Sequence, residues 1–79
     1  MKIKVRYFAV LRDRRGVGEE LIETDVRTVR ELVESLIRQH SLGLPPSLIR
    51  AAVNGSFAND GDKLSDGDEV VLLPPVSGG

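Results

Sequence analysis

The chain of 79 residues has no cysteine, no tryptophan and a single histidine, His40. Without thiols, disulfide bonds, thiolate catalysis and cysteine-based zinc sites are excluded. One histidine cannot assemble a multi-histidine site, so no metal site is expected. His40 falls in the last turn of an expected helix, where a cationic side chain interacts favourably with the helix dipole. This position favours a structural role for His40 over a catalytic one.

Long apolar runs and an excess of charge of one sign are also missing. No stretch approaches the length of a membrane span or of the apolar core of a signal peptide, so we expect a cytoplasmic protein. The formal net charge of −1 gives little support to nucleic-acid binding. A hydrophobic content of 41% with 29% charged residues is typical of a globular domain, and the length allows one small domain.

The first half of the chain predicts a strand hairpin followed by a helix. Apolar and charged residues alternate over residues 2–10, which predicts a strand with Ala9 on its core face. A charged connection over 11–18, interpreted as a solvated loop around Arg14-Arg15 with a helical turn near its start, leads to a weaker antiparallel strand over 19–25.

A capping box, Thr28-x-x-Glu31, then predicts a helix start. The helix should end near residues 40–41, before Gly43 and the prolines that follow. Its apolar stripe has helical spacing and is formed by Val29, Leu32, Val33, Leu36 and Ile37.

The second half predicts strands joined by tight turns. Residues 47–53 are expected to form a third strand, and Asn54-Gly55 is the preferred pair for a hairpin turn. The Asp-rich segments 59–62 and 65–68 lack the spacing of an EF-hand and are interpreted as turns. Residues 69–73 are apolar on both faces, which predicts a central strand covered on both sides.

This order of elements predicts an α+β fold, a mixed sheet of about four to five strands packed on one main helix. If the first and last strands are central and parallel, the arrangement is the β-grasp. We expect a domain over residues 1–73 and an extended tail over residues 74–79.

One face of such a sheet would be left open, and several apolar residues fall where a solvated face should be polar. If they converge, they form a partner surface. The alternative is that some of them pack under the loops at 11–18 or 59–66. These residues are Phe8, Val10, Phe57, Val71 and Leu73.

The C-terminal segment has the features of a peptide that inserts into the active site of another protein. Pro74-Pro75 cannot continue a central strand and favour an extended exit, and the glycines that follow lack a Cβ. Residues 74–79 could reach roughly 20 Å if fully extended. Chain ends are, however, commonly frayed and without function.

The chain resembles the small subunit of molybdopterin synthase, a ubiquitin-like β-grasp sulfur carrier. The most specific block runs over residues 66–79 and ends in Pro-Pro-Val-Ser-Gly-Gly. Weaker matches are Tyr7-Phe8-Ala9 with Arg12-Asp13, and Ala51-Ala52-Val53-Asn54.

The resemblance implies that an E1-like enzyme uses ATP and magnesium to adenylate the terminal carboxylate of Gly79, and that sulfur delivery converts it to a thiocarboxylate. The tail would then enter the large subunit of the synthase and donate sulfur to cyclic pyranopterin monophosphate, in a heterotetramer of two small and two large subunits. The chain would bind no cofactor and would act as a non-catalytic sulfur donor.

The same resemblance assigns candidate site residues. The reactive end would be Gly79 with Gly78 beside it. Phe8, Phe57 and Leu73 match family positions that contact the partner proteins. The tail residues expected to bind the partner are Pro74, Pro75, Val76 and Ser77.

Three alternatives stay open. A carrier for thiamin thiazole synthesis would share the fold and the Gly-Gly end, but such carriers usually lack the preceding Pro-Pro-Val-Ser. A ubiquitin-like modifier would transfer the activated Gly79 to a lysine, and an interaction module would leave its tail idle. Without cysteine, the chain cannot carry sulfur as a persulfide, which favours its carboxyl terminus as the group to which sulfur is attached.

Overall fold

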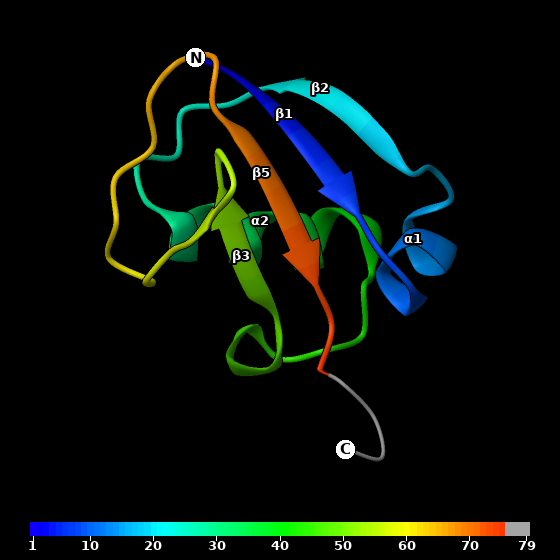
Figure 1. Cartoon of the computed structure of the whole chain (residues 1–79). Coiled ribbons are helices and arrows are strands. Elements are labelled where there is room, and N and C mark those ends of the chain that lie inside the picture. The colour runs from blue at the N-terminus through cyan, green and yellow to red at the C-terminus, as the bar shows by residue number, and fades with distance from the viewer. Residues whose placement is uncertain (76–79) are drawn as a thin grey trace.

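The computed structural model describes residues 1–75 as a five-stranded mixed sheet with one long helix against it (Figure 1). The strands are β1 (Lys2–Tyr7), β2 (Glu19–Glu23), β3 (Arg50–Val53), β4 (Ser56–Phe57) and β5 (Glu69–Leu73). The helices are α1 (Val10–Arg15), α2 (Val29–His40) and the short 3-10 helix η1 (Pro46–Leu48).

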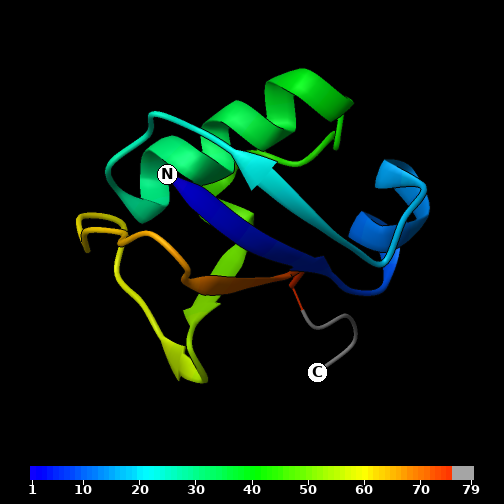
Figure 2. The ribbon, with the colours of Figure 1, turned by 90° about the horizontal axis from the view of Figure 1, so that it is seen from above.

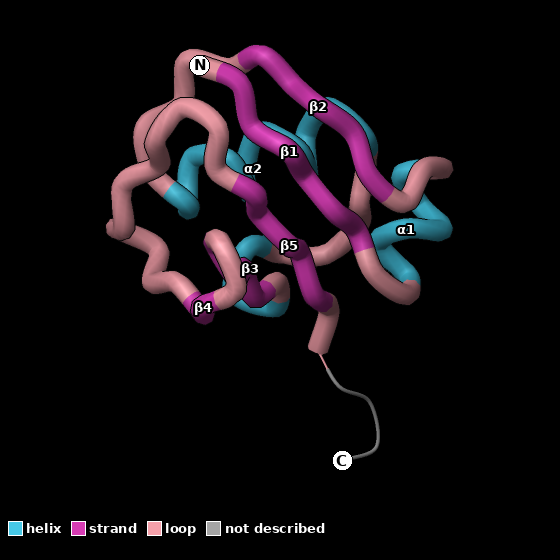
Figure 3. The backbone as a smooth tube through the Cα atoms, turned by 45° about the horizontal axis from the view of Figure 1, so that its top comes forward, coloured by secondary structure: helices cyan, strands magenta, loops and turns pink. Residues whose placement is uncertain are grey.

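The first and last strands lie side by side in the middle of the sheet. The strand order is β2-β1-β5-β3-β4 (Figure 3). The central strands β1 and β5 pair in parallel, and the other three pairs are antiparallel. The predicted β-grasp arrangement is therefore confirmed. Strand β5 is central as predicted, but it is not covered on both faces, because Val71 and Leu73 are only half-buried.

Helix α2 covers one face of the sheet and leaves the other open (Figure 2). Thr28 caps the helix as expected, since its hydroxyl oxygen accepts from the Glu31 N–H at 3.2 Å. The core lies between the apolar stripe of α2 and the inward side chains of the strands, and it includes Ile3, Val5, Tyr7, Leu32, Leu36, Val70 and Leu72.

The turns in the second half also agree with the sequence. Asn54 (φ 51°) and Gly55 (φ 90°) both have positive φ, as a type I′ hairpin turn requires. The carboxylates of Asp62 and Asp68 accept from the backbone N–H groups of Asn59 and Ser65 at 2.9 and 2.8 Å. These aspartates therefore stabilise turns.

Three predicted strands are shorter than expected, and the second of them ends at Glu23 instead of residue 25. Strand β1 ends at Tyr7 because the chain turns at Ala9, which is exposed and has φ 53° and ψ −129°. The predicted core position of Ala9 is therefore wrong, and Val10 begins a helix. The third strand begins at Arg50, because the fixed φ of Pro46 favours the 3-10 helix η1 over residues 46–48.

The arginines of α1 anchor this helix, so the prediction of a solvated loop is wrong. Arg15 donates to both carboxylate oxygens of Glu20 at 2.7 and 2.8 Å, and the Tyr7 hydroxyl donates to the same group at 2.6 Å. Arg14 donates to the Leu42 carbonyl at 2.7 Å. His40 lies in the last turn of α2 with Nε2 3.9 Å from Glu20, in line with a structural role.

The charges of this cluster shift the titration of its members. The Arg15 hydrogen bonds, assisted by the Tyr7 hydroxyl, lower the pKa of Glu20 from 4.5 to about 2. Burial and the hydrogen bond to Glu20 raise the pKa of Tyr7. The Glu20 carboxylate is therefore ionised at neutral pH, as its pairing with Arg15 requires. Among the helices of residues 1–75, none is long and apolar enough to span a bilayer.

The lowered pKa of Glu20 predicts acid sensitivity. The contribution of ionised Glu20 to the free energy of unfolding is fully present above the pKa that Glu20 has in the unfolded chain. This contribution is lost as the pH falls through the lower pKa that Glu20 has in the folded chain. When the pH falls from about 5 to about 2, the free energy of unfolding of the parent should drop by about 1–2 kcal/mol more than that of Glu20→Gln. This figure is smaller than the pKa shift alone would give, because solvent screens a partly exposed ion pair. Urea titrations measure this difference. Glu23→Gln, on the same strand but 70% exposed, should behave as the parent. Equal pH slopes for the parent and Glu20→Gln would contradict the assignment.

The turn at Ala9 predicts a stabilising glycine. A non-glycine residue in this φ/ψ region costs about 1–3 kcal/mol, which exceeds the about 0.5–1 kcal/mol entropic cost of glycine. Ala9→Gly should raise the free energy of unfolding by about 0.5–1 kcal/mol in urea denaturation. Ala52→Gly, the same change inside β3, should lower it. A loss of stability in both variants would show that Ala9 is not strained.

Candidate functional site

The open face of the sheet carries a continuous row of apolar side chains. Along β5, Val70 and Leu72 are buried toward α2, so Val71 and Leu73 point to the open side. The register places Ala52 of β3 beside Val71 and Phe57 of β4 beside Ala52. Residues paired across strands project from the same face, so the row extends across β5, β3 and β4.

The parallel pairing of the central strands adds Phe8 to this row. Tyr7 pairs with Leu72, and the Phe8 N–H donates to the Leu72 carbonyl at 3.3 Å. Phe8 therefore lies beside Leu73. We define the apolar strip as Phe8, Ala52, Phe57, Val71 and Leu73.

The strip is accessible at both ends. Phe57 is 65% exposed and Phe8 is 37% exposed, which is unusual for phenylalanine in a small domain. The strip also reaches the end of β5, where the chain continues into Pro74 and Pro75 (Figure 1). An apolar surface rimmed by polar residues is typical of a protein-interaction site.

The structure brings most of the predicted site residues together. Phe8, Phe57 and Leu73 lie on the open face, and Pro74 follows directly. Val10 is separate from them because it begins α1. The predicted tail residues Val76, Ser77, Gly78 and Gly79 lie outside the described residues.

Two arginines lie beside the strip that were not predicted as site residues from the sequence. The guanidinium carbon of Arg6 lies 5.4 Å from the centre of the Phe8 ring, and that of Arg50 lies 4.6 Å from the centre of the Phe57 ring. Both distances are within the range of a cation–π interaction. The alternation of β1 already places Arg6 on the face of Phe8, but the position of Arg50 depends on the register of β3, which no local pattern indicates.

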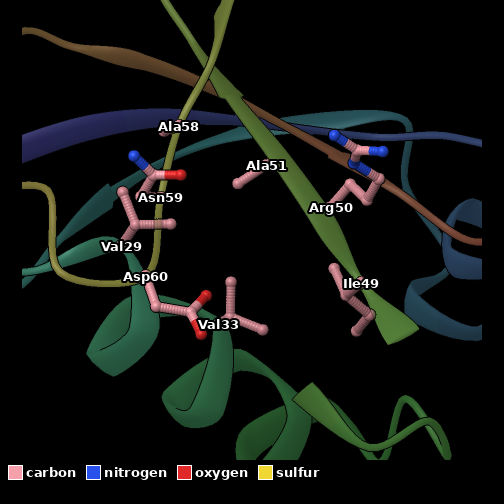
Figure 4. A pocket seen from close by; sticks show the side chains of 8 residues that line it. All are labelled: Val29, Val33, Ile49, Arg50, Ala51, Ala58, Asn59 and Asp60. Carbon is pink, nitrogen blue, oxygen red and sulfur yellow. The ribbon is translucent and has the colours of Figure 1, made fainter. Parts of the chain in front are cut away.

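A separate hollow of about 260 Å³ lies between the start of α2, strand β3 and the segment after β4 (Figure 4). Its apolar floor includes Val33, Ile49 and Ala51. The carboxylate at its rim, Asp60, already pairs with Arg30 at 3.1 Å. Residues 1–75 also contain no group of three or more acidic or histidine side chains that could hold a metal ion. No serine, threonine, histidine or lysine lines the hollow, so it offers no nucleophile beside a base.

Comparisons of sequence agree with this geometry. The family model described as the ThiS family matches residues 5–79. The molybdopterin synthase sulfur carrier subunit of Chlamydomonas reinhardtii is 39% identical, with 100% of each chain covered. The subunit of the same name from Escherichia coli strain K12 is 36% identical, covering 98% of this chain and 99% of that one.

Solved structures agree as well. SAMP1 from Haloferax volcanii has a TM-score of 0.80 at 28% identity, with 100% of both chains covered. A complex of subunits 1 and 2 of molybdopterin-converting factor from Helicobacter pylori contains a chain with a TM-score of 0.69 at 29% identity, also with full coverage. The chain belongs to the ThiS family, and its resemblance to the small subunit of molybdopterin synthase extends over its whole length.

Proposed function

We propose that this chain is the sulfur carrier subunit of a molybdopterin synthase and carries sulfur as a thiocarboxylate on Gly79. The observation that supports this most strongly is the full-length similarity to two molybdopterin synthase sulfur carrier subunits. The apolar strip supports it further, because a carrier must dock on its partners beside the segment that it delivers.

The chemistry requires activation, since a carboxylate is a poor electrophile. In the proposed cycle an E1-like enzyme, using ATP and magnesium, joins the Gly79 carboxylate to AMP and releases pyrophosphate. A reduced sulfur donor then attacks the carbonyl carbon and AMP leaves, so that one oxygen of the carboxylate is replaced by sulfur. The chain itself supplies only the carbonyl and a thin backbone that fits a narrow channel.

The partner that receives the sulfur is proposed to be the large subunit of the synthase. The Helicobacter pylori complex pairs a chain of the same fold with subunit 2 of molybdopterin-converting factor. By analogy, the strip would dock on the large subunit, residues 74–79 would enter its active site, and sulfur would pass to cyclic pyranopterin monophosphate. We place this reaction in the cytoplasm, in a heterotetramer of two small and two large subunits.

A second candidate is a protein modifier, favoured by the similarity to SAMP1 of Haloferax volcanii, one of the small archaeal modifier proteins. A modifier would use the same activation of Gly79 but would form an amide with a lysine of another protein. Lysine-linked adducts ending in Gly79 would identify this use.

The proposed carrier function predicts a change in mass that depends on Gly79. After incubation with an E1-like enzyme, ATP, magnesium and a sulfur source, the intact mass should increase by the replacement of one oxygen by sulfur. The increase should be absent when Gly79 is deleted, while the thermal unfolding of the two proteins is the same. A variant with Arg27→Ala, at an exposed position away from the tail, should still gain the sulfur, because its carboxyl terminus is unchanged. An unmodified parent, with an enzyme shown to be active, would contradict the carrier function.

The proposed docking surface predicts that Phe8 contributes to binding of the large subunit. Phe8→Asp places a charge in the apolar strip and should weaken binding to the large subunit by at least about tenfold, because that charge must be desolvated in the interface. Leu48→Asp is a matched control, since Leu48 is 44% exposed but lies in η1, outside the strip. Titration calorimetry measures both. Equal affinities of Phe8→Asp and the parent would exclude the strip as the docking surface.

A further inference from the structure

Two guanidinium groups border the apolar strip and are held against its aromatic rings. Arg6 of β1 lies two residues before Phe8 with its guanidinium over the Phe8 ring, and the guanidinium of Arg50 of β3 lies over the Phe57 ring. The two arginines therefore lie at different points of the strip, since Arg50 pairs with Leu73 and Arg6 pairs with Val71. The open face thus combines an apolar centre with two positioned cations.

Neither arginine forms an ion pair with a carboxylate of residues 1–75. Glu19 of β2 is the cross-strand partner of Arg6 but pairs with Lys4, whose Nζ lies 3.1 Å from Glu19 and 3.8 Å from Glu69 of β5. The cross-strand neighbour of Arg50 is the apolar Leu73. By contrast, Arg15 and Arg30 each form ion pairs with carboxylates. Arg6 and Arg50 thus differ from these two arginines, because they have no carboxylate partner within the described chain.

Stacking prepares such an arginine for a carboxylate. An aromatic ring contacts the flat face of a guanidinium and leaves the N–H groups at its edge available. A carboxylate can accept two of these N–H groups at once, which makes the pair strong and geometrically specific. Because the side chain is already held by its ring, less conformational entropy is lost on binding.

We propose that the surface of the large subunit that covers the apolar strip presents carboxylates opposite Arg6 and Arg50. This inference rests on the proposed function and specifies the chemistry of its partner. A protein surface is favoured over a nucleic acid because the cations flank an apolar centre, the arrangement of a protein interface with arginine near its core, and because the net charge is −1.

Charge reversal tests the proposal. Arg6→Glu and Arg50→Glu should each weaken binding to the large subunit at least about tenfold at low salt, and the double variant by more, because carboxylates would then face carboxylates. Arg27→Glu makes the same change at an exposed position just before α2 and should stay within about twofold of the parent. Raising the salt concentration should weaken the parent more than the double variant.

A cross-linking experiment identifies the facing group directly. A carbodiimide joins amines to nearby carboxylates, so the Arg50→Lys and Arg6→Lys variants should each form a cross-link to the large subunit that the parent does not form at that position. Peptide mapping by mass spectrometry should locate it on an Asp or Glu of the large subunit. Arg27→Lys should form no such cross-link.

The outcomes separate this inference from the function on which it rests. A parent that fails to bind an active large subunit would overturn both. A parent that binds, with reversal variants within about twofold of it, would overturn the carboxylates alone. Binding of the parent to a single-stranded oligonucleotide that is lost in the double variant, without any change in affinity for the large subunit, would also overturn the proposal.

Discussion

The parallel pairing of β1 and β5 is the interaction on which the candidate site depends. Parallel strands end at the same edge of the sheet, so the residues that follow Tyr7 and Leu72 become neighbours although they are far apart in the sequence. This pairing puts Phe8 beside Leu73 at the point where the chain continues into Pro74. An antiparallel arrangement would have placed Phe8 at the opposite end, away from the segment proposed to carry the sulfur.

The rest of the fold maintains this edge. Helix α2 buries the inner side chains of both central strands, so their outer side chains must either be solvated or bind a partner. Strand β1 ends at Tyr7 and the chain turns at Ala9, directly after Phe8, while the Arg15–Glu20 pair holds the helix that follows against β1 and β2. The position of Phe8 is thus determined by contacts on both sides of it in the chain. The stacked arginines make the same surface selective by charge as well as by shape.

Local signals in the sequence predicted the elements better than their ends. Helix α2 and the Asn54-Gly55 turn could be predicted because capping and positive φ depend on a few adjacent residues. The end of β1 could not, because the alternation continues through Ala9 and alanine gives no sign of a turn. The pairing of Arg15 with Glu20 and the stacking of Arg50 on Phe57 depend on tertiary contacts and strand register. The convergence of Phe8, Phe57 and Leu73 on one face could be predicted from the alternation of side chains along each strand, once a β-grasp was assumed.

The most direct test of the account is the stoichiometry of sulfur transfer in a reconstituted reaction. The chain is first converted to its thiocarboxylate and is then mixed with the large subunit and cyclic pyranopterin monophosphate, and the thiocarboxylate consumed is compared with the molybdopterin formed. Because the dithiolene contains two sulfur atoms, the account predicts that two chains return to the carboxylate form for each molybdopterin. Consumption of thiocarboxylate without molybdopterin, or molybdopterin formation that does not depend on this chain, would contradict it.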